Sequence, residues 1–72
     1  MDNRLQTIYK AVQAYHARHD PPQTGPGYWE WAIADMQAVS SLYDNSLFIK
    51  GLLGAVFDDL EREYKRLLAE QA

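Results

Sequence analysis

The sequence predicts an all-α fold: a three-helix bundle with a long C-terminal helix, in one domain that spans residues 1–72. Two observations carry this prediction. Apolar residues recur every three or four positions in three separate stretches, which is the spacing of one face of an α-helix. The stretches are separated at 20–27 by three prolines and two glycines, and at 44–46 by the polar run Asp-Asn-Ser. We therefore expect helices near 3–19, 28–43 and 46–70.

The first helix is predicted from an apolar stripe that ends in a histidine. Its members are Leu5, Ile8, Tyr9, Val12, Tyr15 and His19. Either Asp2 or Asn3 can cap the start, because their side chains accept bonds from the free N–H groups of the first turn. The helix should end by about Asp20, since Pro21 and Pro22 cannot continue it.

The second helix carries both tryptophans, on different sides. Its stripe consists of Trp29, Ala32, Ile33, Met36, Val39 and Tyr43. Trp31 is rotated about 200° from Trp29, so we expect Trp29 in the core and Trp31 on a mixed face with Asp35, Ala38 and Leu42. An exposed tryptophan is a common anchor for a partner protein. Tyr28, Trp31 and Asp35 are therefore predicted protein-contact residues.

The third helix is predicted to organise the fold. Its stripe consists of Ile49, Leu53, Val56, Leu60, Tyr64 and Leu67, widened by Leu52, Phe57 and Leu68. A stripe this broad should pack against at least two other elements. Asp44, Asn45 and Ser46 each offer an N-cap. Towards the C-terminus, the four-residue spacing predicts the ion pairs Asp58–Arg62, Glu61–Lys65 and Arg66–Glu70.

Two glycines lie inside the third helix, and each costs about 1 kcal/mol relative to alanine. Gly51 and Gly54 are therefore expected where another backbone approaches closely, either the first helix or a second copy of the chain. A chain of 72 residues buries only about 60% of its unfolded surface, and without cysteine it has no disulfide to help. We expect it to form a homodimer or to bind a partner.

Composition excludes several function classes. A net charge of −3 gives no electrostatic footprint for direct nucleic-acid binding. No run of 18 apolar residues or signal-peptide core is present, so we expect no membrane span and a cytoplasmic protein. No glycine-rich phosphate loop follows a strand, and no serine has a base at a recognisable spacing. We therefore expect no enzyme activity and no cofactor.

The end of the first helix carries three residue types that can bind a metal ion. His16, His19 and Asp20 are close enough in sequence to converge on one ion. A structural site normally needs four ligands, however, and the chain has no other histidine and no cysteine. Histidines near a helix C-terminus are also favoured by the helix dipole alone. The sequence therefore predicts no metal site.

Four carboxylates gather in the third helix: Asp58, Asp59, Glu61 and Glu63. Catalytic carboxylate pairs need environments that separate their pKa values, usually burial in a cleft. On an exposed helix, a salt-bridged surface is the simpler interpretation. The functional alternative is an acidic docking surface for a basic partner.

Two alternatives to a protein-binding role stay open. In the first, Gly51 and Gly54 mediate a self-assembling structural module. In the second, the last two helices form a helix-turn-helix DNA-binding regulator. Its recognition helix would present Leu47, Phe48 and Ile49 to the bases, with Lys50 the only basic side chain before Arg62. That composition makes DNA reading the less favoured alternative.

Two segments resemble the small acidic helical proteins carried by bacteriophages and other bacterial mobile elements. They are Tyr28–Met36 (YWEWAIADM) and Ala55–Glu63 (AVFDDLERE). The resemblance is one of type, over the length, charge and helix content of the whole chain, and it assigns no residue a role. Such proteins include the anti-CRISPR proteins. The resemblance therefore implies an inhibitor that occupies a surface of a host defence complex, which can itself be a nucleic-acid-binding complex.

Overall fold

The computed structural model describes residues 3–71 and contains three helices. They are α1 (Arg4–His19), α2 (Tyr28–Leu42) and α3 (Leu47–Gln71). No strand occurs within the described residues. The predicted all-α fold with a long C-terminal helix is confirmed, and each boundary falls within one residue of its predicted position.

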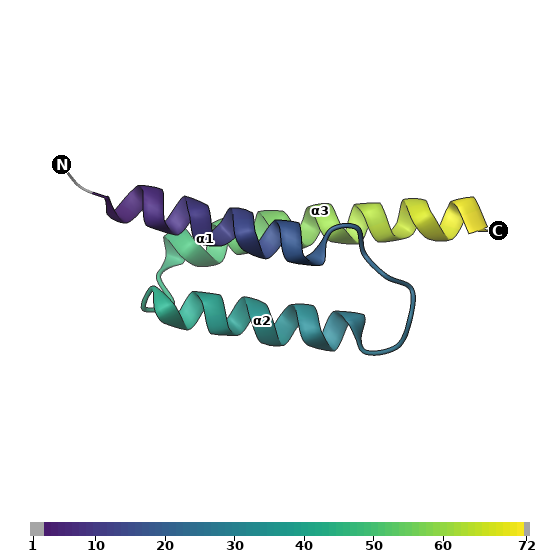
Figure 1. The fold of residues 1–72 in the computed structure, drawn as a ribbon, viewed down its shortest axis with the longest axis horizontal. Helices are drawn as coiled ribbons and strands as arrows, with labels where there is room; N and C mark the ends of the chain where they lie inside the picture. The colour runs from purple at the N-terminus through teal and green to yellow at the C-terminus, as the bar shows by residue number, and fades with distance from the viewer. Residues whose placement is uncertain (1–2, 72) are drawn as a thin grey trace.

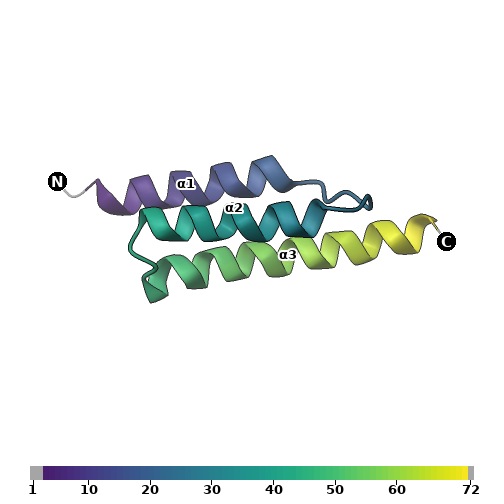
Figure 2. The same cartoon turned by 90° about the horizontal axis from the view of Figure 1, so that it is seen from below.

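The three helices run alternately up and down in a bundle about 50 Å long and 18–20 Å across (Figure 1). Turned by 90°, the molecule shows the helices side by side (Figure 2), and each helix contacts both others. In both views α3 continues past the loop that joins α1 to α2, while α1 begins beyond the turn that joins α2 to α3. The ends of the long helices therefore overhang the bundle.

The core consists of residues from all three helices. Its buried members are Ile8, Val12, Tyr15, Val39, Ile49, Leu53 and Leu60. Removing one Leu or Ile side chain from water contributes roughly 1.5–3 kcal/mol, so these contacts supply most of the packing energy. The prediction that the third helix packs against both others is confirmed.

Parts of the predicted stripes lie outside this core. Leu5 near the start of α1 and Leu68 near the end of α3 are exposed, because both regions overhang the bundle. Tyr9 is also exposed, although its ring contacts Phe48 of α3 at a centroid distance of 6.0 Å. The placement of Ile33 in the stripe of α2 is wrong, since its side chain is 40% exposed. Ala32, the preceding member of the predicted stripe, is fully buried, and Ile33 is rotated about 100° from it.

The turn between α2 and α3 follows the predicted capping chemistry. The backbone N–H of Ile49 donates to the hydroxyl oxygen of Ser46 at 3.2 Å, so Ser46 caps α3. Asp44 and Asn45 adopt left-handed conformations, with φ of 61° and 51°. The N–H of Asn45 donates to the carbonyl oxygen of Ser40 at 2.9 Å, which closes the end of α2.

The remaining helix ends differ in how they are capped. Asn3 occupies the N-cap position of α1, but its side chain makes no capping bond. Asp2, the other candidate, lies outside the described residues. The predicted loop at 20–27 is confirmed, and it ends at Gly27, whose φ of 89° is left-handed. Within residues 3–71, none of the helices combines the length and hydropathy needed to cross a bilayer.

Candidate functional site

A polar cluster lies where the end of α1 meets the start of α2. Nε2 of His19 lies 2.7 Å from Oδ2 of Asp35, and Arg18 donates to the same oxygen from Nε at 3.1 Å and Nη2 at 2.8 Å. The His19 residue is 1% exposed. Its ring centroid lies 4.5 Å from that of Tyr15 and 3.8 Å from that of Trp31. Asp35 therefore links two side chains of α1 to α2. We call this contact of His19, Arg18 and Asp35 the joint, and Trp31 covers it.

Two buried tyrosine hydroxyls complete this joint. Tyr15 donates to the carbonyl oxygen of Ala32 at 2.8 Å, and Tyr28 donates to that of His19 at 2.6 Å. Burial, and then the charge of Asp35, raise the pKa of Tyr15 to about 12. Burial, and then the charge of Asp20, raise the pKa of Tyr28. Both phenols therefore keep their protons at neutral pH and act as hydrogen-bond donors.

The Asp35 carboxylate is held in its charged form. Burial acts to raise its pKa, but the hydrogen bonds from His19 and Arg18 outweigh burial, and the pKa lies below the usual value of 3.8. A proton-transfer catalyst would instead need a pKa near the working pH and reach to a substrate. Among the described residues, the buried side-chain polar atom without a hydrogen-bond partner is Nδ1 of His19. The geometry is that of a structural joint.

The two histidines of α1 point to different partners. Nε2 of His16 lies 2.9 Å from Oδ2 of Asp59 on α3, whereas His19 faces Asp35 on α2. The two imidazoles therefore do not converge on one point. Within residues 3–71, no three His, Cys, Asp or Glu side chains are grouped in a way that could hold a metal ion.

The two tryptophans occupy the environments that their spacing predicted. Trp29 is half-buried, and its ring lies 5.2 Å from Phe57 and 5.3 Å from Tyr64. Trp31 is 47% exposed. Tyr28 is only 5% exposed, so it supports the base of the Trp31 ring and offers little surface of its own to a partner. The contact between Trp31 and His19 could not be found from the sequence, because it depends on how α1 and α2 cross.

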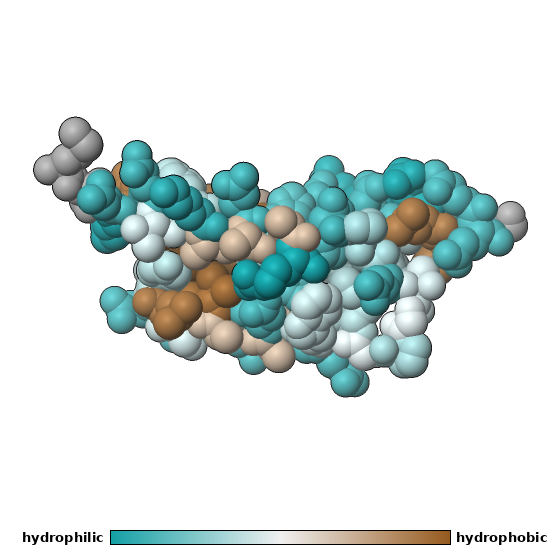
Figure 3. Space-filling model, viewed as in Figure 1, coloured by the Kyte–Doolittle hydropathy of each residue, from teal (hydrophilic) through white to brown (hydrophobic). Residues whose placement is uncertain are grey.

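One face of α2 is exposed and almost uncharged. We call it the Trp31–Leu42 face and define it by Trp31, Ala34, Ala38 and Leu42. The only charged residue between Trp31 and Leu42 is Asp35, which is already paired within the chain. Leu42 is 76% exposed. Figure 3 shows apolar surface gathered over the end of α2 that leads to α3, at the lower left of the view.

The four carboxylates of α3 do not share one side of the helix. Asp59 and Glu63, four residues apart, lie on the side that faces α1, where Asp59 pairs with His16 and Glu63 with Arg66. Asp58 and Glu61, three apart, lie on another side. Asp58 pairs with Arg62 at 3.2 Å.

Two of the three predicted ion pairs of α3 are present. Asp58–Arg62 and Arg66–Glu70 are confirmed. The prediction of a Glu61–Lys65 pair is wrong, because neither side chain has an ion-pair partner among residues 3–71. Exposed pairs of this kind gain little over hydration, so spacing alone does not ensure that they form.

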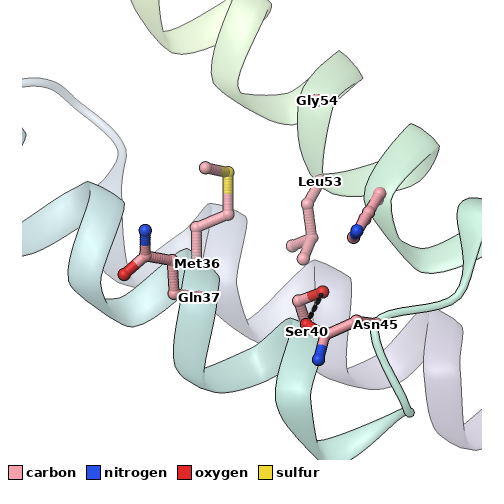
Figure 4. Close-up of a pocket in the computed structure, with 7 residues that line it drawn as sticks. Met36, Gln37, Ser40, Asn45, Leu53 and Gly54 are labelled. Atoms are coloured by element: carbon pink, nitrogen blue, oxygen red, sulfur yellow. Dashed lines mark hydrogen bonds between the residues drawn. The ribbon is translucent and has the colours of Figure 1, made fainter.

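A groove lies between α2 and α3, with a volume of about 290 Å³. We call it the α2–α3 groove; its lining residues are Met36, Gln37, Ser40, Asn45, Lys50, Leu53 and Gly54. In Figure 4, Met36 and Leu53 point into the space between the two helices, and Ser40 donates to Asn45 at the end nearest the turn. A Cβ added at Gly51 or Gly54 would meet no atom within 4 Å. The first helix is therefore not the close neighbour of these glycines.

The chain was also compared with known proteins. No protein-family model, no curated protein and no solved structure matches it.

Proposed function

We propose that this chain is a non-catalytic protein-binding module, which inhibits a bacterial target by occupying part of its surface. The observation that carries the proposal is the Trp31–Leu42 face. Over twelve residues this face exposes tryptophan, alanine and leucine. The one carboxylate within these twelve residues, that of Asp35, is already paired with Arg18 and His19 of α1. The centres of protein interfaces are similarly poor in charge and rich in aromatic side chains.

Trp31 is well placed to act as the anchor of such a contact. Its ring rests on His19 and lies 6.1 Å from Tyr28, so much of its freedom is lost before any partner arrives. A side chain that is already ordered pays less entropy on binding. Ala34 and Ala38 next to it are small, which lets a partner's backbone approach α2 closely.

The inhibitor role and the bacterial target are proposed on the basis of the resemblance to phage and mobile-element proteins. The acidic side chains support a basic partner surface, such as that of a nucleic-acid-binding complex. Asp58, Asp59, Glu61 and Glu63 would contribute by long-range attraction, because Asp58, Asp59 and Glu63 are already engaged within the chain. We assign most of the free energy of binding to Trp31 and Leu42.

Capture from a bacterial lysate with three matched baits tests the proposal. The baits are the wild type, Leu42→Glu on the proposed face, and Leu68→Glu, which introduces the same charge at another exposed leucine. We expect one protein to be retained in constant proportion by the wild type and by Leu68→Glu, and to be lost with Leu42→Glu. Retention of the same protein by all three baits would remove the Trp31–Leu42 face from the proposal.

A further inference from the structure

We propose that the chain forms a two-fold homodimer through the α2–α3 groove, with the α3 helices of the two copies antiparallel. In this arrangement Gly54 of each copy faces Phe57 of the other, and Lys50 faces Glu61. The groove lies on the opposite flank of α2 from the Trp31–Leu42 face. The dimer is therefore independent of the proposed function and leaves that face free.

The contact residues form one stripe along α3. Lys50, Gly54, Phe57 and Glu61 follow at steps of four, three and four, so they share one side of the helix. Two observations place this side towards the groove. Lys50 and Gly54 line it, and Phe57 contacts Trp29 of α2. The same spacing of residues forms the seam between paired helices.

The two charged ends of this stripe complement each other only between copies. Lys50 and Glu61 are exposed, and neither has an ion-pair partner among residues 3–71. Eleven residues of helix separate them by roughly 16 Å, so they cannot reach one another within a chain. When the stripe is reversed by a two-fold axis, each Lys50 faces a Glu61, and the pattern matches itself.

The centre of the stripe is complementary in shape as well. Gly54 presents bare backbone with open space beyond it, and Phe57 is a half-buried ring one turn away. In an antiparallel dimer, the Phe57 side chain of each copy lies opposite the open space at Gly54 of the other. Met36 and Leu53 supply the apolar floor, and the exposed Ile33 extends it along α2.

The size of this side suits a dimer. A stable interface buries roughly 800 Å² on each partner. The flank that would supply this area is formed by the 15 residues of α2 and the 25 residues of α3, about 22 Å and 38 Å of helix. Gly54 inside α3 costs helix stability that no contact within the chain offsets, since a Cβ at this position would meet no atom within 4 Å. Association of copies provides the missing contact.

Charge reversal followed by sedimentation equilibrium tests the dimer. Lys50→Glu places two acidic groups together, and Glu61→Lys two basic groups, so each should weaken dimerisation by about tenfold or more. The double variant Lys50→Glu/Glu61→Lys restores opposite charges and should recover wild-type association. Lys10→Glu, the same change at an exposed site on α1, is the control and should have no effect.

Recovery in the double variant is the decisive result, because two residues this far apart cannot rescue one another within a monomer. Gly54→Leu gives a second arm: a Cβ at this position meets no atom within 4 Å in the monomer, so helix content should be kept while the dimer is lost. A wild type that is monomeric throughout the micromolar range would overturn the proposal. Dimerisation that is unaffected by both single charge reversals, or that the double variant fails to restore, would also overturn the proposal.

Discussion

Asp35 shows how one side chain can fix the crossing of two helices. Its carboxylate accepts bonds from His19 and Arg18 of α1, and its own helix contributes the tryptophan that covers them. The spacing of α1 predicted that His19 lies on the buried stripe, which the structure confirms. Its partner could not be predicted, because spacing fixes the side of a helix but says nothing about which residue of another helix lies opposite.

Asp35→Asn should lower the free energy of unfolding at pH 7 by about 2 kcal/mol, since it removes charged hydrogen bonds from a mostly buried site. The pKa of Asp35 is lower in the folded chain than its usual 3.8. Its contribution is therefore fully present above that value and is lost as the pH falls below it. Urea unfolding of both proteins from pH 7 to pH 2 should show the difference closing on the acid side.

Asp58→Asn is the matched control for this measurement, because Asp58 pairs with Arg62 at an exposed position of α3. The control should stay within about 0.5 kcal/mol of the wild type. A gap between Asp35→Asn and the wild type that is as large at pH 2 as at pH 7 would mean that the carboxylate charge is not what stabilises the joint.

Gly51→Ala should raise the free energy of unfolding by up to about 1 kcal/mol, because alanine favours the helix and its Cβ meets no atom. Gly27→Ala should do the opposite, since Gly27 has a φ of 89° that alanine adopts only with strain. Urea unfolding in the Lys50→Glu background, where the proposed dimer is weakened, separates these effects from association. Loss of stability in Gly51→Ala would show that this part of α3 is crowded.

At the scale of the elements, α3 acts as the spine of the molecule. Its length, its broad stripe and a capping residue at Asp44, Asn45 or Ser46 could be predicted from the sequence, because each depends on residues close together in the chain. What the sequence could not predict was where the stripe stops being buried. The end of the buried stripe depends on the lengths of the other two helices. Because α3 is longer than both, Leu60 is fully buried whereas Leu68 is exposed.

Leu60→Ala and Leu68→Ala compare these two positions directly. The first should lower the free energy of unfolding by about 2–5 kcal/mol, because it leaves a cavity in the core. The second should cost less than about 1 kcal/mol, because Leu68 lies on the overhanging end of α3. Chemical denaturation monitored by circular dichroism checks both. Equal losses would mean that the end of α3 is packed as tightly as its middle.

At the candidate site, the side of the helix on which a residue lies could be predicted from the sequence, but its contacts with other helices could not. Exposure of Trp31 followed from its rotation relative to Trp29, and the structure confirms it. Tyr28 was expected beside it as a contact residue, but its hydroxyl reaches back to α1 and its ring is buried. The groove between α2 and α3 could not be predicted from the sequence, because its lining residues come from two helices and the turn between them.

At the scale of the whole molecule, α2 separates two surfaces with different proposed tasks. On one flank, the α2–α3 groove carries a charge pattern that matches its own reverse, which suits a second copy. On the other, the Trp31–Leu42 face carries no pattern of charge that could match itself, which suits a different protein. A two-fold dimer would present two such faces, and a partner bound through both would gain from their linkage.

We propose that a partner protein contacts the outer face of α2, and the indole groups of Trp29 and Trp31 report on this contact directly. The measurement follows the indole N–H signals of the ¹⁵N-labelled chain by nuclear magnetic resonance as the captured partner is added, with Trp31→Phe used to assign them. We expect the Trp31 signal to shift or broaden while the signal of Trp29, held between Phe57 and Tyr64, stays in place. A bound partner that leaves the Trp31 signal unchanged would contradict the account.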